Sequence, residues 1–330
     1  MAQPATLTSP AFTPYSGYAL AALGAILFST KGIFIKLAYG TDTDAAIHVD
    51  AITLLALRVA FALPFYLVVG GLAWRGRVKD GKPLPTAREA ILAALVGLLG
   101  YYLASYLDFQ GLVYLTAQFE RLILYTYPVF VMILGALFFG GRITAVGIAS
   151  LLVAYAGIAA IFLKGAAGQG DNAALGVGLV LACAFVFALY QLLAKSMITR
   201  IGSRIFTCIA MIAASAGIMA HYLAVNSVSD LFAVPTHIAL IGALLGVFAT
   251  VLPSFMLNAA LERIGAEAVS TIGTLSPVAT TAMAILVLGE PFTLTDALGT
   301  ALVITGVGLF TWHDGRRRAA TAALAATGQA

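Results

Sequence analysis

Two basic side chains stand inside long apolar stretches of this chain. Lys31 lies in the stretch AILFSTKGIFIK, and Arg58 lies in the stretch ITLLALRVAF. A charged side chain at the centre of a lipid-buried helix costs about 2.5 to 3.5 kcal/mol, whereas a central Leu returns only about 0.6 kcal/mol. Such residues are retained where they bind a solute or pair with an opposite charge. Lys31 and Arg58 are therefore candidate substrate contacts.

Each of these two residues has two interpretations. Lys31 is too deep in its segment to reach a membrane surface easily, so we expect it to face a cavity and bind substrate or an internal counter-ion. A purely structural ion pair is the alternative. Arg58 could clamp an anion, because the guanidinium group matches the geometry of a carboxylate. Equally, it could hold neighbouring helices together.

Three further charges flank a short hairpin. Asp108 ends one apolar segment, and Glu120 and Arg121 begin the next, so we expect a charged cluster at the outer mouth. With a rise of about 1.5 Å per residue, Glu120 lies near the depth of Lys31, which favours a Lys31–Glu120 pair. The alternative places Glu120 and Arg121 among lipid headgroups. Glu120 could take up a proton, although a facilitator needs no such group.

Aromatic hydroxyls and one amide are candidates for the walls of a cavity. Such groups orient a polar solute against an apolar surface. The candidates are Tyr102, Tyr125, Tyr127, Tyr190 and Gln191. A Tyr near the end of a span is more often an interfacial anchor, which favours the deeper Tyr125, Tyr127 and Tyr190.

Three prolines interrupt apolar segments. Pro128 and Pro277 occupy equivalent positions in two similar stretches, and Pro253 lies in a third segment. A proline inside a helix removes one hydrogen bond and leaves a kink. The symmetric positions favour gating hinges, and a static bend is the alternative.

Lipid is the solvent that this composition requires. Hydrophobic residues make up 61% of the 330 positions and charged residues 10%, against roughly 25% charged residues in an average soluble domain. A transmembrane helix needs about 20 apolar residues, and the chain contains ten such blocks. The predicted spans are 16–39, 50–73, 88–109, 116–138, 143–163, 174–196, 202–224, 237–260, 266–288 and 293–312.

The distribution of Lys and Arg tests this count independently, because cytoplasmic loops are rich in both. With a cytoplasmic N-terminus, the outside loops hold only Lys164. The inside segments hold Arg75, Arg77, Lys79, Lys82, Arg88, Arg142, Lys195, Arg200, Arg204, Arg263, Arg316, Arg317 and Arg318. The alternation predicts ten spans with both termini in the cytoplasm, in an inner or plasma membrane.

The chain contains an internal duplication. Residues 112–162 align without a gap on residues 261–311 at a constant offset of 149, with Pro128 on Pro277 and Gly157 on Gly306. Each copy holds five spans, an odd number, so the second copy enters the membrane from the opposite side. We therefore predict an all-α integral membrane protein with two inverted five-helix repeats. The predicted parts are a tail at 1–15, repeats at 16–164 and 174–312, and a basic tail at 313–330.

Two segments resemble the drug/metabolite transporter superfamily, specifically its EamA-type ten-helix permeases. They are TYPVFVMILGALFFGGRIT and TLSPVATTAMAILVLGEPFTLTDALGTALVITGVG. The first copy departs from the second at Gly141, which stands in the place of Glu290. The resemblance covers nearly the whole chain. It implies a central cavity lined by helices 1 to 4 and 6 to 9, and small organic metabolites such as amino acids as substrates.

The remaining features argue against other classes. The chain has no HExxH, Walker or GxSxG motif, and its histidines are too dispersed for a metal site, so we expect no cofactor, no metal and no enzyme activity. Scattered basic residues argue against nucleic acid. We expect a secondary transporter of amino acids or other carboxylates, with export the favoured direction. An intramembrane enzyme or lipid-handling protein is the alternative. Lipid surrounds the protein, and a homo-oligomer is compatible with this interpretation.

Overall fold

The computed structural model is almost entirely helical in the residues that it describes, which are 14–40, 49–138, 144–165, 172–257, 259–260, 272–273 and 275–327. Within them, seven helices are long and apolar enough to cross a membrane, and three shorter helices, Ala145–Ile161, Leu275–Leu288 and Leu294–Leu309, are also apolar. These ten segments fall where the ten spans were predicted. The predicted all-helical membrane fold is confirmed.

The first repeat consists of five spans, two of which are broken. The third span passes through a π-helical turn, and the fourth is interrupted by a two-residue turn at Tyr125 and Thr126. Its elements are α1 (Pro14–Tyr39), α2 (Ala51–Lys79), α3 (Ala87–Gly97), η1 (Leu98–Leu103), α4 (Ala104–Tyr114), α5 (Ala117–Leu124), α6 (Tyr127–Phe138) and α7 (Ala145–Gly165).

The second repeat follows the same order, with a short extra helix in one loop. Its elements are α8 (Ala173–Ile201), α9 (Ser203–Val225), α10 (Val228–Ala233), α11 (Thr236–Gly246), η2 (Val247–Val251), α13 (Leu275–Leu288) and α14 (Leu294–Thr327). Helix α14 continues through most of the stretch that was predicted as a tail. The predicted start of the ninth span, at residue 266, lies outside the described residues.

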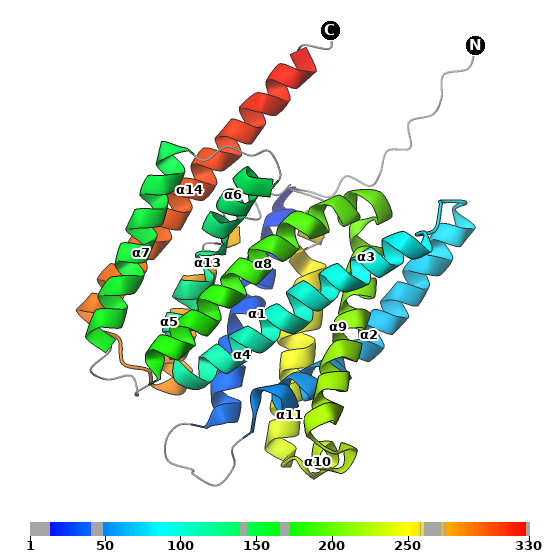
Figure 1. The fold of residues 1–330 in the computed structure, drawn as a ribbon, viewed down its shortest axis with the longest axis horizontal. Helices are drawn as coiled ribbons and strands as arrows, with labels where there is room; N and C mark the ends of the chain where they lie inside the picture. Colours follow the sequence, from blue (N-terminus) through cyan, green and yellow to red (C-terminus); the bar gives the residue numbers. More distant parts are fainter. Residues whose placement is uncertain are drawn as a thin grey trace.

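The two repeats pack in an inverted arrangement. The beginning of α1 and the end of α14 both lie toward the top of Figure 1. Helix α3 packs on α9, and its counterpart α11 packs on α2. A β-carbon at Gly97 would clash with the backbone of Ala210, and one at Gly246 would lie 2.7 Å from the carbonyl oxygen of Arg58. Gly246 follows Gly97 by 149 residues, the offset of the duplication, so both copies use a glycine for the same close approach.

The two π-helical turns are also related by the duplication. η1 begins at Leu98 and η2 at Val247, again 149 residues apart. In η2, the Thr250 hydroxyl donates to the carbonyl oxygen of Leu245 at 2.8 Å. Pro253, two residues beyond this turn, has no N–H to continue a regular α-helix. Turns of this kind are frequent at functional sites, and both halves place one in their third span.

The prolines do not all act as mid-helix kinks. Pro128 is the second residue of α6, where a missing N–H costs little, so the fourth span breaks before it instead of bending at it. Pro277 is the third residue of α13. A further proline, Pro64, lies inside α2 and was not predicted as a kink.

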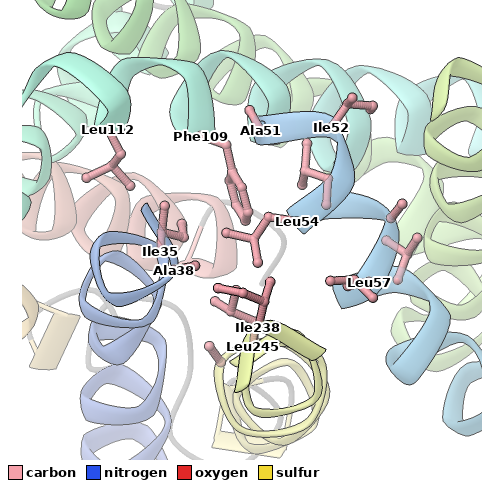
Figure 2. Close-up of a cluster of buried hydrophobic side chains, with 14 of the residues drawn as sticks. Ile35, Ala38, Ala51, Ile52, Leu54, Leu57, Phe109, Leu112, Ile238 and Leu245 are labelled. Atoms are coloured by element: carbon pink, nitrogen blue, oxygen red, sulfur yellow. The ribbon is translucent and has the colours of Figure 1, made fainter. Parts of the chain in front are cut away.

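An apolar cluster that includes residues of α1, α2, α4 and α11 lies near the end of the bundle opposite the termini. Figure 2 shows Ile35 of α1, Leu54 of α2, Phe109 of α4 and Ile238 of α11 directed toward one another. All four side chains are buried. This packing fixes α1, α2 and α4, which carry Lys31, Arg58 and Asp108.

Helices α7 and α14 pack face to face away from this cluster. A β-carbon at Gly157 would lie 2.6 Å from the carbonyl oxygen of Gly299, and one at Gly306 would lie 2.6 Å from that of Ser150. Close backbone contact through glycines is typical of helix pairs in membranes. The pair consists of the last span of each repeat.

This contact predicts a matched pair of substitutions. Gly306→Leu should destabilise the protein, because overpacking costs about 1 to 3 kcal/mol. Gly308→Leu should have little effect, because a β-carbon at Gly308 meets nothing within 4 Å. Thermal unfolding in detergent, followed by size-exclusion chromatography, measures both. Equal melting temperatures for the two variants would contradict the assigned packing.

Candidate functional site

The best-defined polar contact inside the bundle is an ion pair between α1 and α4. Nζ of Lys31 lies 2.7 Å from Oδ2 of Asp108, and the two side chains are 8% and 1% exposed. A buried charge without a partner is strongly unfavourable. The pair therefore holds α1 and α4 together and neutralises both charges.

The predicted partner of Lys31 was Glu120, and that prediction is wrong. Depth placed Glu120 correctly near Lys31, but depth says nothing about the direction in which each helix face points. The third span also continues to Tyr114, so Asp108 lies about 9 Å inside the bundle at 1.5 Å per residue. That position puts Asp108 deep enough to reach Lys31 first.

Glu120 lies beside this pair and is completely buried. Its carboxyl group is within hydrogen-bonding reach of the Asp108 carboxyl. Oε2 of Glu120 would lie 3.5 Å from a β-carbon at Gly32 of α1. Among the described residues, neither oxygen of Glu120 accepts a hydrogen bond from a protein donor. The two carboxyl groups thus face each other.

Arg121 joins α5 to α1 and α13. Its Nη2 donates to the carbonyl oxygen of Phe28 at 3.0 Å, and its Nε donates to Oγ1 of Thr280 at 3.2 Å. The Thr280 hydroxyl in turn donates to the carbonyl oxygen of Ser29 at 3.3 Å. The hydroxyls of Ser29 and Ser276 lie 2.8 Å apart. These hydrogen bonds, from Arg121 and from hydroxyl groups to neutral partners, link the two repeats next to the ion pair.

Lys31, Asp108, Glu120 and Arg121 are hereafter called the charged cluster. All four are buried, so the cluster lies inside the protein and not among headgroups. The ring of Phe28 faces two of its cations, at 5.4 Å from Nζ of Lys31 and 5.3 Å from Cζ of Arg121. Aromatic faces attract cations at such distances.

Arg58 contacts η2 of the second repeat and α4 of the first, and its hydrogen-bond partners are neutral. Its Nε donates to Oγ1 of Thr250 in η2 at 2.8 Å, and its Nη1 donates to Oγ of Ser105 at 3.3 Å. Its Cζ lies 5.7 Å from the ring centre of Phe109. Within the described residues, no carboxylate lies within 4 Å of this 5% exposed side chain.

Helix α4 connects Arg58 to the charged cluster. Ser105, which contacts Arg58, and Asp108, which pairs with Lys31, are three residues apart and share one helix face. Arg58 was predicted from the sequence, whereas its partners Thr250 and Ser105 were not. Hydroxyl residues are common in membrane helices, where they bond to their own backbone, so their type alone gives no signal.

The aromatic candidates do not all lie together. Tyr190 donates to the hydroxyl oxygen of Tyr101 at 2.9 Å, and Gln191 hydrogen-bonds to Tyr127. Tyr102 lies apart from these, with its hydroxyl 3.0 Å from Nδ1 of His221 on α9. The remaining candidate, Tyr125, is buried at the turn between α5 and α6.

Glu290 has a role that the sequence did not indicate. Its Oε1 accepts from the backbone N–H of Ala117 at 2.7 Å, and its Oε2 accepts from that of Gln118 at 3.3 Å. A carboxylate at a helix N-terminus satisfies free N–H groups and the helix dipole. A loop of the second repeat thus caps α5, the helix that carries Glu120. Gly141, its counterpart in the first copy, lies outside the described residues.

The model of the EamA-like transporter family matches residues 15–163 and again residues 174–312. These two stretches are the two halves of the fold. The chain belongs to the EamA-like transporter family. The EamA-type, drug/metabolite transporter resemblance that the sequence motifs carried is confirmed.

Relatives agree with the EamA assignment. The chain is 29% identical over 303 residues to the uncharacterized transporter YcbK of Bacillus subtilis, covering 86% of this chain and 90% of that one. It is 26% identical over 284 residues to an uncharacterized transporter of Archaeoglobus fulgidus, covering 86% and 96%. A solved crystal structure is similar with a TM-score of 0.61 and 19% identity, over 92% of this chain and 98% of that one, which shows the fold. The family and these relatives make this EamA protein a multi-pass membrane transporter.

The ion pair predicts which charge reversal is tolerated. Lys31→Asp should lower the yield of folded protein sharply, because breaking a buried pair costs about 3 to 5 kcal/mol. Adding Asp108→Lys should restore much of that yield. Fluorescence-detected size-exclusion chromatography of membranes measures it.

The matched control reverses an exposed carboxyl. Lys31→Asp combined with Asp80→Lys should not restore folding, because Asp80 is exposed beside Lys82 and Asp108 still lacks its cation. Rescue by this second combination and not by the first would contradict the assigned pair.

Proposed function

We propose that this protein is a secondary transporter that exports small carboxylate-bearing metabolites by alternating access. The observation that carries the proposal is Arg58, a buried guanidinium whose hydroxyl partners come from both repeats, Ser105 of α4 and Thr250 of η2. Inverted-repeat transporters bind substrate near the midplane between their halves.

Arg58 is the proposed docking residue for the substrate carboxylate. A guanidinium recognises a carboxylate through two parallel hydrogen bonds. Its present partners, Thr250 and Ser105, are neutral and weaker acceptors than an anion. A carboxylate could therefore replace one hydroxyl contact with a charge-assisted one and supply the negative charge that the site lacks.

Lys31 has a different role in this proposal. Because it is paired with Asp108, it acts as the internal counter-ion, and its contact with substrate would first require breaking that pair. The aromatic side chains Tyr127 and Tyr190, with Gln191, are proposed to contact the remainder of the solute. They lie on α6 and α8, which pack together.

The movable parts are proposed to be the interruptions of the spans. The π-helical turns η1 and η2 and the break between α5 and α6 each remove regular helical hydrogen bonds at the level of the site. A change of hydrogen-bond register at these points would tilt one half against the other. In this proposal, Pro128, Pro253 and Pro277 keep these positions from forming continuous helix.

The proposed membrane and orientation rest on the distribution of charge along the chain. The distribution of Lys and Arg supports cytoplasmic termini in a plasma or inner membrane. The proposed partners are a small-molecule substrate and the surrounding lipid. Transport is proposed without a catalytic step, since the family and the named relatives are transporters.

Counterflow in proteoliposomes tests the proposal. Purified protein should exchange a labelled carboxylate from a panel of amino acids and organic acids, and amide analogues should compete poorly. Arg58→Gln should raise KM for the best carboxylate by about 30-fold or more, because losing a buried charged contact costs about 2 to 5 kcal/mol. Arg75→Gln, an exposed position near the end of α2, is the matched control and should behave as wild type.

Two outcomes would overturn the proposal. One is an unchanged KM for carboxylates in Arg58→Gln. The other is equal exchange of carboxylates and their amide analogues by the wild-type protein. Arg58→Lys separates charge from geometry, and we expect it to recover only part of the affinity.

A further inference from the structure

We propose that Asp108 and Glu120 together bind one proton, and that this proton is carried with the substrate in each transport cycle. The inference rests on the proposed function, because it assigns a coupling ion to the same site. Its starting point is the contact between two buried carboxyl groups, one on α4 and one on α5.

The chemistry of this contact calls for a proton. An ionised carboxylate is only an acceptor of hydrogen bonds, so two ionised groups at hydrogen-bonding distance repel each other. A proton between them converts the repulsion into a short, charge-assisted hydrogen bond. Two carboxyl groups that share a site ordinarily share one proton in this way.

The local charges are balanced before this proton binds. With both carboxyls ionised, the charged cluster balances two cations against two anions, so a proton raises its charge from neutral to one positive charge. The charged and titratable groups that face the pair come from α1, α2, α5 and α8. They are Lys31, Tyr39, Arg58, Arg121 and Cys183.

The proton and an anionic substrate should bind cooperatively. Loading the pair adds positive charge near Arg58, which interacts with Asp108 across one face of α4. A substrate carboxylate at Arg58 adds the compensating negative charge. By linkage, each ligand strengthens the binding of the other. The two therefore move in the same direction, and a monocarboxylate crosses without net charge.

The Glu290 cap of α5 connects movement of the two halves to the distance between Glu120 and Asp108. Glu120 lies in the first turn of α5, which Glu290 caps from the loop between α13 and α14. A relative movement of the two halves that breaks this cap would shift α5 and separate Glu120 from Asp108. Separation removes the shared hydrogen bond and releases the proton to the compartment that the site then faces.

The direct test measures protons and substrate in the same proteoliposomes. A trapped pH-sensitive dye reports proton movement when a gradient of the best carboxylate is applied without sodium. The wild type should move about one proton per substrate, as expected for one proton shared by two carboxyls. In Glu120→Gln the ratio should fall to zero, at whatever rate the substrate moves. Asp80→Asn, an exposed carboxyl variant, should keep the wild-type ratio.

A second measurement does not depend on transport. Infrared difference spectroscopy of the full protein should show the carbonyl stretch of a protonated carboxylic acid that disappears in Glu120→Gln. Absence of this band across the stable pH range, substrate flux without proton flux, or an unchanged ratio in Glu120→Gln would each overturn the inference. Net carboxylate flux without proton flux would remove the proton site alone, whereas loss of carboxylate recognition with the band present would remove only the proposed substrate class.

Discussion

The need to neutralise charges inside a lipid-embedded bundle is the constraint on which the rest of this structure depends. Lys31 and Asp108 are both buried and lie 2.7 Å apart, and either charge alone would cost several kcal/mol. This requirement fixes α1 against α4 and places Glu120 beside the pair. Arg58 is also buried, with the neutral partners Thr250 and Ser105, and we propose that a substrate carboxylate balances its charge.

Duplication supplies the geometry around these charges. The same offset of 149 residues relates Gly97 to Gly246 and the start of η1 to the start of η2. Each half therefore brings a closely packed glycine and a π-helical turn to the centre of the fold. The charged cluster breaks the symmetry, because its ionisable groups all come from the first repeat, with the second contributing hydroxyls and the Glu290 cap. A symmetric scaffold thus holds an asymmetric site.

The sequence correctly predicts those features of the fold that depend on one helix at a time. Apolar length and the alternation of Lys and Arg act on single spans, which is why the ten spans and the inverted halves were predictable. Sequence reasoning failed where two helices must be placed against each other. Lys31 and Glu120 have similar depths, but only helix rotation decides that Asp108 is the partner. Thr250 reaches Arg58 from η2, a change of helical register that no pattern of apolar residues encodes.

The claim that the Arg58 site opens in turn to each side of the membrane is tested most directly by the accessibility of a cysteine at that site. Ser105, beside Arg58, can be changed to Cys in a background in which the native Cys183 and Cys208 are replaced. The account predicts that a membrane-impermeant thiol reagent labels Ser105→Cys from either side of oriented vesicles, and that a transported carboxylate slows both reactions. Labelling from one side only, under every substrate and pH condition, would contradict a site that two inverted halves expose in turn.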